Sequence, residues 1–166
     1  MTPQELVLDK LLPLDDLCRR RCGWRNVSQR TVFTNGVFDL IHPGHLTYLA
    51  QARGLGQRLI VGVNTDASVR RLKGDRRPVM PLAARMQLLA GLFYVDGVIA
   101  FDEDTPLDLI TALRPDVLVK GGDYAADEIV GAAAVRSWGG EVRVLPFVAG
   151  QSSTAIIDRL QTPVTP

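Results

Sequence analysis

The sequence is poor in cysteine and histidine and has almost no net charge. Each of these residue types occurs twice among 166 residues, and 19 basic residues nearly balance 18 acidic ones, which leaves a formal charge of +1. Such a balance gives no electrostatic reason to expect a nucleic-acid or membrane-surface partner. Residues 1–14 contain acidic residues and prolines but no long apolar run, so we expect neither a signal peptide nor a membrane anchor.

The two cysteines, Cys18 and Cys22, are four residues apart and can share one face of a helix. A disulfide or half of a metal site would fit this spacing. Because no two further ligands lie nearby, we interpret them as ordinary thiols of a reducing cytoplasm. We therefore expect a cytoplasmic protein without a resident metal, and a chain of this length can fold as one compact domain without disulfides.

After residue 30, short apolar segments alternate with helical patterns. Strands are predicted at 31–34, 58–63, 97–101, 116–120 and 141–146, and helices at 43–53, 66–72, 82–95, 106–113, 127–138 and 153–160. Five such strands separated by helices predict an α/β fold with a doubly wound parallel sheet. We expect a helical lead-in over 1–30, with its helix at 13–21, then the α/β domain over 31–160 and a frayed tail over 161–166.

The end of the first strand carries the residues best suited to a ligand, since such sheets bind ligands beyond the carboxyl ends of their strands. The strand runs into Asn-Gly-Val-Phe-Asp at 35–39 and then into His-Pro-Gly-His at 42–45. Gly36 allows the backbone to approach a ligand closely. Pro43 opens a helix whose free amides and dipole favour an anion.

His42 and His45 are the only histidines in the chain, and they stand three residues apart at this helix start. Both can therefore face the same anion, and imidazoles can donate hydrogen bonds to phosphoryl oxygens as charge builds there. The alternative is one satisfied histidine at the helix start and one surface histidine. The flanking Gly-Val-Phe-Asp favours a phosphate-handling site.

The run 35–45 closely resembles the nucleotidyltransferase superfamily with the His-x-Gly-His signature. That group includes cytidylyltransferases for glycerol phosphate and ethanolamine phosphate and an adenylyltransferase for pantetheine phosphate. After residue 30 the likeness covers nearly the whole chain and points to the D-glycero-β-D-manno-heptose 1-phosphate adenylyltransferase branch. It is carried by segments 63–68, 71–75, 77–79, 101–106, 119–124 and 152–154. In many bacteria this activity is the C-terminal half of a bifunctional kinase–adenylyltransferase; no kinase domain precedes it here, so we expect a stand-alone form.

The resemblance implies a Rossmann-like nucleotidyltransferase fold and transfer of AMP from ATP to a heptose 1-phosphate. The products would be pyrophosphate and an ADP-heptose, a precursor of the lipopolysaccharide inner core. A phosphate oxygen of the sugar would attack the α-phosphorus directly, so no protein nucleophile is expected. Mg²⁺ is expected to travel with ATP, held largely by phosphates and water. A homodimer is expected from the resemblance and from the frequency of two-fold assemblies.

The catalytic candidates are His42, His45 and Lys73. The resemblance places Lys73 at the nucleotide phosphates, and the alternative is a solvated lysine within the basic cluster 70–77. The nucleotide-binding candidates are Gly36, Val37, Phe38, Gly44, Arg85, Lys120, Gly121, Asp123, Ser152, Ser153 and Thr154.

Three groups among these nucleotide-binding candidates have their own alternatives. Arg85 could instead point outward from its helix, and Asp123 could cap the next one. The glycines of 120–124 would let the base or ribose come near, and the hydroxyls and free amides of 152–154 would cradle the triphosphate. An ordinary cap explains one of these hydroxyls but not three in a row.

Asn35, Asp39, Asn64 and Arg77 are tentative candidates for the sugar phosphate. Asn35 and Asp39 could instead only shape the turn, and Arg77 could equally be a solvated arginine. The acidic run 102–104 lacks the spacing of a metal loop and is interpreted as a solvated approach to a helix.

Two other functions remain open at this point. The first is a cytidylyltransferase for a polyol or amino-alcohol phosphate, because the same phosphate-binding residues would serve it. The second is a nucleotide-sensing module without catalysis, which the intact histidine pair with Lys73 and the hydroxyl run disfavours.

Overall fold

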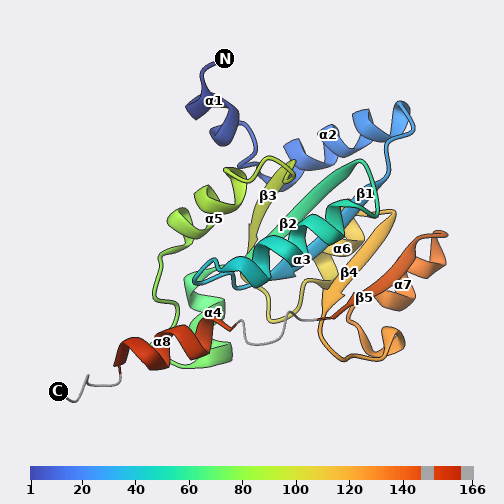
Figure 1. Ribbon diagram of the computed structural model, residues 1–166. Helices are drawn as coiled ribbons and strands as arrows, with labels where there is room; N and C mark the ends of the chain where they lie inside the picture. The colour runs from blue at the N-terminus through green and yellow to red at the C-terminus, as the bar shows by residue number, and fades with distance from the viewer. Residues whose placement is uncertain (147–151, 162–166) are drawn as a thin grey trace.

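The computed structural model describes residues 1–146 and 152–161 and contains one five-stranded sheet (Figure 1). Its strands are β1 (Thr31–Gly36), β2 (Arg58–Asn64), β3 (Gly97–Phe101), β4 (Val117–Gly121) and β5 (Glu141–Leu145). Their order is β3-β2-β1-β4-β5, and every neighbouring pair is parallel. The expected doubly wound parallel sheet is confirmed.

Helices cover both faces of the sheet because successive strand residues point to opposite sides. On one face, Val32 and Val61 pack with Leu49 of α3 (Pro43–Arg53) and Leu89 of α5 (Leu82–Ala90). On the other face, the core joins Phe33 and Ile60 to residues of α2 (Leu14–Asn26), α6 (Leu107–Leu113) and α7 (Ala132–Ser137), namely Leu17, Ile110 and Val135. Trp24 and Trp138 pack against this second cluster.

The remaining elements lie around the rim of the sheet. They are α1 (Pro3–Leu8), α4 (Asp66–Lys73), the 3-10 helix η1 (Ala126–Glu128) and α8 (Ser153–Gln161). In Figure 1, α8 lies beside α4, below the start of α3. The tail expected at 161–166 lies outside the described residues except for Gln161, which belongs to α8.

Several helix boundaries differ from those expected from the sequence. The lead-in contains α1, which was not predicted, and α2 continues through Gly23, where a methyl group would meet no atom within 4 Å. The helix expected over 82–95 ends at Ala90, and Phe93, which follows it, is 91% exposed. The helix expected over 127–138 is split at Gly131, whose φ of +88° brings its backbone against Ile110.

The winding of the sheet reverses between β1 and β4. From β1 the chain proceeds outward through β2 to β3, and then crosses to β4 and β5 on the other side of β1. Ligands of doubly wound sheets bind at such a reversal, beyond the carboxyl ends of the strands. Within the described part of the chain, no helix has the length and apolar character needed to cross a bilayer.

Candidate active site

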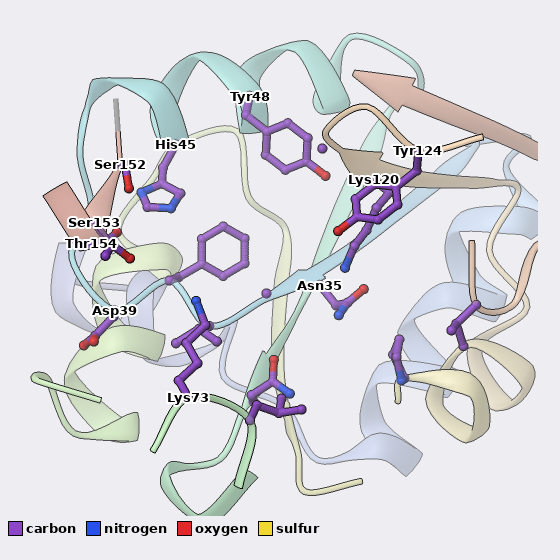
Figure 2. A pocket seen from close by; sticks show the side chains of 18 of the residues that line it. Asn35, Asp39, His45, Tyr48, Lys73, Lys120, Tyr124, Ser152, Ser153 and Thr154 are labelled. Atoms are coloured by element: carbon purple, nitrogen blue, oxygen red, sulfur yellow. The ribbon is translucent and has the colours of Figure 1, made fainter. Parts of the chain in front are cut away.

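A cavity of about 760 Å³ opens at the carboxyl ends of β1 and β4 (Figure 2). It collects most of the residues singled out in the sequence, from segments far apart in the chain. They are Asn35, Gly36, Val37, Phe38, Asp39, His42, Gly44, His45, Asn64, Lys73, Arg77, Lys120, Gly121, Ser152, Ser153 and Thr154. Arg85 and Asp123 are not among the residues that line it.

The two histidines face each other at the first turn of α3. The amide of His42 donates to Nδ1 of His45 over 3.3 Å, and the ring centroids lie 3.8 Å apart. A neutral ring that accepts this hydrogen bond on Nδ1 carries its proton on Nε2. Nδ1 of His42 is buried without a hydrogen-bond partner in the described part of the protein. The ring of His42 therefore has an unpaired nitrogen beside the ring of His45.

Both imidazoles are held in the neutral state. The pKa of His45 is lowered to about 4, mainly by burial and also by the neighbouring His42 and Lys73, while a hydrogen bond with the Leu40 carbonyl opposes the shift. Burial also lowers the pKa of His42. At neutral pH the pair therefore offers hydrogen-bond donors without a positive charge.

The turn between β1 and α3 brings Phe38 back over Gly36. Phe38 has a φ of +49°, and its ring lies 5.4 Å from that of His45, centroid to centroid. A Cβ atom at Gly36 would lie 3.0 Å from the Phe38 ring. The glycine is therefore needed for this internal contact as well as for any close approach of a ligand.

Asp39 shapes the turn, which is one of the two roles that the sequence left open, and it also lines the cavity. Its buried carboxylate accepts from Nε of Arg77 over 2.7 Å and from the amides of Val79 and Met80 over 2.9 Å. Burial raises the pKa of Asp39, but the hydrogen bonds from Met80, Val79 and Arg77 outweigh it and hold the pKa below its usual value. The charge of Arg77 is thereby neutralised inside the protein.

Arg85, a predicted nucleotide contact, lies outside the cavity lining and supports the loops behind it. Its side chain is fully buried, and all three nitrogens have protein acceptors. Nε donates to Met80 O over 3.0 Å, Nη1 to Val37 O over 2.6 Å and Nη2 to Asp66 Oδ1 over 2.7 Å. The guanidinium thus ties the turn after β1 to the segment that follows Lys73.

Lys73 ends α4, and Gly74 with a φ of +89° turns the chain away behind it. Burial lowers the pKa of Lys73 and nearby Arg77 lowers it further, whereas Asp39 acts in the opposite direction. Figure 2 shows Lys73 reaching into the cavity below His45. An ammonium group here is well placed to bind phosphate oxygens.

The hydroxyl run at the start of α8 joins the histidine turn. Ser153 Oγ donates to the carbonyl of Leu40 over 2.9 Å, and Ser152 Oγ accepts from the Ala155 amide over 3.4 Å as a helix cap. Figure 2 shows Ser152, Ser153 and Thr154 beside His45. Gln151, which precedes them, lies outside the described residues.

Several lining residues were not singled out as candidates from the sequence. Tyr48 lies one turn after His45; its hydroxyl is 2.6 Å from Thr34 Oγ1, and burial raises the pKa of Tyr48 to about 12. The three-residue spacing from His45 could have identified it. Asp104, Thr105 and Pro106 also line the cavity. Asp104 carries an ion pair with Arg71 at 3.1 Å.

The cavity is rich in donors and cations. Among the described residues, no group of three histidine, cysteine or acidic side chains could hold a metal ion. Neutral imidazoles, a lysine and hydroxyls at a helix start suit a bound polyphosphate whose charge increases during a reaction.

Comparisons with known proteins agree with this geometry. Residues 33–159 match the cytidylyltransferase-like family. The chain is 54% identical over 152 residues to the bifunctional protein HldE of Methylobacillus flagellatus, covering 92% of this chain and 31% of that protein. It is 55% identical over 151 residues to HldE of Pseudomonas syringae pv. syringae, covering 91% and 30%. The chain thus spans about a third of the length of these relatives.

A solved structure shows the same fold. The lipopolysaccharide core biosynthesis protein from Thermoplasma volcanium aligns with a TM-score of 0.59 and 29% identity, over 72% of this chain and 97% of that one. The likeness therefore covers both the sequence and the fold. The chain belongs to the cytidylyltransferase-like family and is a nucleotidyltransferase.

Proposed function

We propose that this protein transfers AMP from ATP to D-glycero-β-D-manno-heptose 1-phosphate, giving ADP-heptose and pyrophosphate for the lipopolysaccharide inner core. The observation that carries the proposal is the neutral histidine pair, which shares one cavity with Lys73 and the hydroxyls of Ser152–Thr154. The choice of a heptose acceptor is supported by the identity to HldE proteins over nine tenths of the chain.

The reaction would be a single in-line displacement. An oxygen of the sugar phosphate forms a bond to the α-phosphorus of ATP, and the bond from that phosphorus to the oxygen bridging the β-phosphorus breaks. Pyrophosphate leaves with the electron pair. No proton has to move, because the attacking phosphate is already ionised at neutral pH. The protein's contribution is to position both substrates and to stabilise the charge that develops.

Different residues around the histidine turn would have different roles in this reaction. His42 and His45 would donate hydrogen bonds to oxygens of the reacting phosphates, and Lys73 would supply the positive charge. The hydroxyls at the start of α8 would bind the outer phosphates. ATP would enter as its magnesium complex, with the metal held by phosphates and water.

The proposal also includes a cytoplasmic location and a homodimer. Cys18 and Cys22 are free thiols in the structure, which fits a reducing compartment. Sedimentation velocity of the purified chain tests the dimer directly.

The test is an assay of pyrophosphate release with Mg²⁺, each nucleoside triphosphate in turn and a panel of sugar and polyol phosphates. We expect release with ATP and heptose 1-phosphate. Release with CTP and glycerol phosphate instead would favour a cytidylyltransferase, which the phosphate-binding residues would serve equally well. No release with any pair would leave a nucleotide-binding module without catalysis.

A further inference from the structure

Two lysines in the cavity make no ion pair with a described side chain, and they lie in different places. Arg77 is paired with Asp39, whereas neither Lys73 nor Lys120 makes a hydrogen bond or ion pair with the described residues. For Lys120, burial lowers the pKa and no neighbouring charge opposes it. A cation held in such surroundings gains most from an anionic ligand.

The register of the sheet places Lys120 beside Asn35. Phe33 of β1 is level with Leu118 of β4, and Asn35 and Lys120 each follow two residues later. Side chains two apart on a strand share a face, so both continue the side of the sheet covered by α6 and α7. In Figure 2, Lys120 and Asn35 point toward the same part of the cavity.

The histidines approach from the opposite side of the sheet. They belong to α3, which packs on the other face, and Figure 2 shows Ser152, Ser153 and Thr154 beside His45 and away from Lys120. The cavity therefore has two ends. One contains the histidine pair, Lys73 and the hydroxyls; the other contains Lys120 and Asn35, with Thr105 and Glu128 also in the cavity lining.

Two anions must meet in this cavity if the protein is a nucleotidyltransferase with a phosphorylated acceptor. Like charges resist the approach of an attacking oxygen to within about 3–3.5 Å of phosphorus. The histidine end already offers a set of donors for the triphosphate. A second cation across the cavity is what the acceptor's own phosphate requires.

We propose that Lys120, with Asn35 beside it, binds the phosphate of the acceptor and not the nucleotide. Lys120 would hold the attacking group at the end of β4 and make a phosphomonoester the required acceptor. This inference rests on the proposed nucleotidyl transfer and assigns Lys120 to the second substrate, whereas the sequence alone placed it with the nucleotide.

The experiment measures binding of each substrate separately by calorimetry, with heptose 1-phosphate and a non-hydrolysable ATP analogue as probes. We expect Lys120→Met to weaken heptose 1-phosphate binding by about 10- to 100-fold, the loss typical of a hydrogen bond to a charged group, and to leave the analogue unaffected. The matched variant Lys73→Met should show the reverse pattern. Lys120→Arg should recover much of the lost affinity, which a purely structural role would not predict.

Other outcomes decide against the inference. Weaker binding of the ATP analogue with unchanged heptose 1-phosphate binding would assign Lys120 to the nucleotide. If Lys120→Met lost as much affinity for free heptose as for heptose 1-phosphate, Lys120 would not recognise the phosphate. A wild-type chain that binds no sugar phosphate overturns the inference, whereas one that binds it but releases no pyrophosphate overturns only the proposed function.

Discussion

The two ends of the cavity are built differently. At the histidine end, the turn after β1 is fixed by buried groups: Asp39 accepts three hydrogen bonds, and Arg85 donates from all three of its nitrogens. At the Lys120 end, the segment after β4, here called the open end, is largely exposed to solvent. Tyr124 is 53% exposed, Val130 is 43% exposed, and only a short 3-10 helix precedes Gly131.

The difference matches two different tasks. Donors that stabilise charge in a transition state must be held close to one geometry, and buried hydrogen bonds to their supports achieve this. A surface that recognises one acceptor among many phosphorylated compounds needs shape and a few polar groups instead. We therefore expect substitutions of His45 and of its supporting residue Arg85 to affect rate or stability, and substitution of Lys120 to affect the affinity for the acceptor.

The largest effect is expected at the histidine pair. His45→Ala removes a hydrogen-bond donor to the reacting phosphates and should lower kcat by about 10²–10³-fold. Binding of a non-hydrolysable ATP analogue should change little, because the contact strengthens as charge develops. Steady-state kinetics measures kcat, and calorimetry measures the affinity for the ATP analogue. Gln51→Ala, on the exposed side of α3, serves as the control and should retain full turnover. Near-normal turnover of His45→Ala would show that the histidine is not catalytic.

Substitution of Arg85 tests whether its buried hydrogen bonds stabilise the histidine end of the cavity. Arg85→Met leaves Asp66 and two carbonyls without their donor and should lower the free energy of unfolding by about 3 kcal/mol. Arg70→Met removes an exposed arginine and should change it by less than about 0.5 kcal/mol. Urea denaturation measures the free energy of unfolding of both variants. Loss of ATP affinity in Arg85→Met at unchanged stability would instead indicate a nucleotide contact.

The neutral state of His45 predicts a pH dependence of stability. Its pKa is about 4 in the folded protein against an ordinary value of 6.5. Between these values the unfolded chain binds more protons, so the free energy of unfolding falls as the pH drops from 6.5 toward 4. At pH 5 this one group should account for a loss of about 2 kcal/mol.

His45→Gln isolates this contribution from the other titrating groups. Urea denaturation at pH 7.5 and pH 5 should show wild type losing about 2 kcal/mol more than the variant does. Equal losses for both proteins would mean that His45 titrates near its ordinary value and is not kept neutral by burial.

The smallest effect is expected at the open end. Asp123 is exposed and outside the cavity lining, although Lys120, Gly121 and Tyr124 around it belong to that lining. Asp123→Ala should therefore change the KM for ATP by less than about twofold. A tenfold rise would place a nucleotide contact at Asp123, as the sequence had suggested, and would make this end part of the nucleotide site.

The sequence was most informative where local signals decide the structure. The helix 43–53 was predicted with its observed bounds, because a proline opens it and Gly54 ends it. The strand 97–101 was also predicted with its observed bounds. The split of the expected helix 127–138 could not be foreseen, since it depends on Gly131 meeting Ile110 from another helix.

What the sequence determined by itself is the order of strands and helices and the histidine turn, because both follow from periodicity and adjacent residues. The tertiary structure alone decided which residues meet across the strand ends. It brought Lys120 and Asn35 to the same part of the cavity, turned Asp39 toward Arg77, and buried Arg85 behind the turn it supports (Figure 2). Those relations depend on strand register and packing between distant segments, which no local pattern encodes.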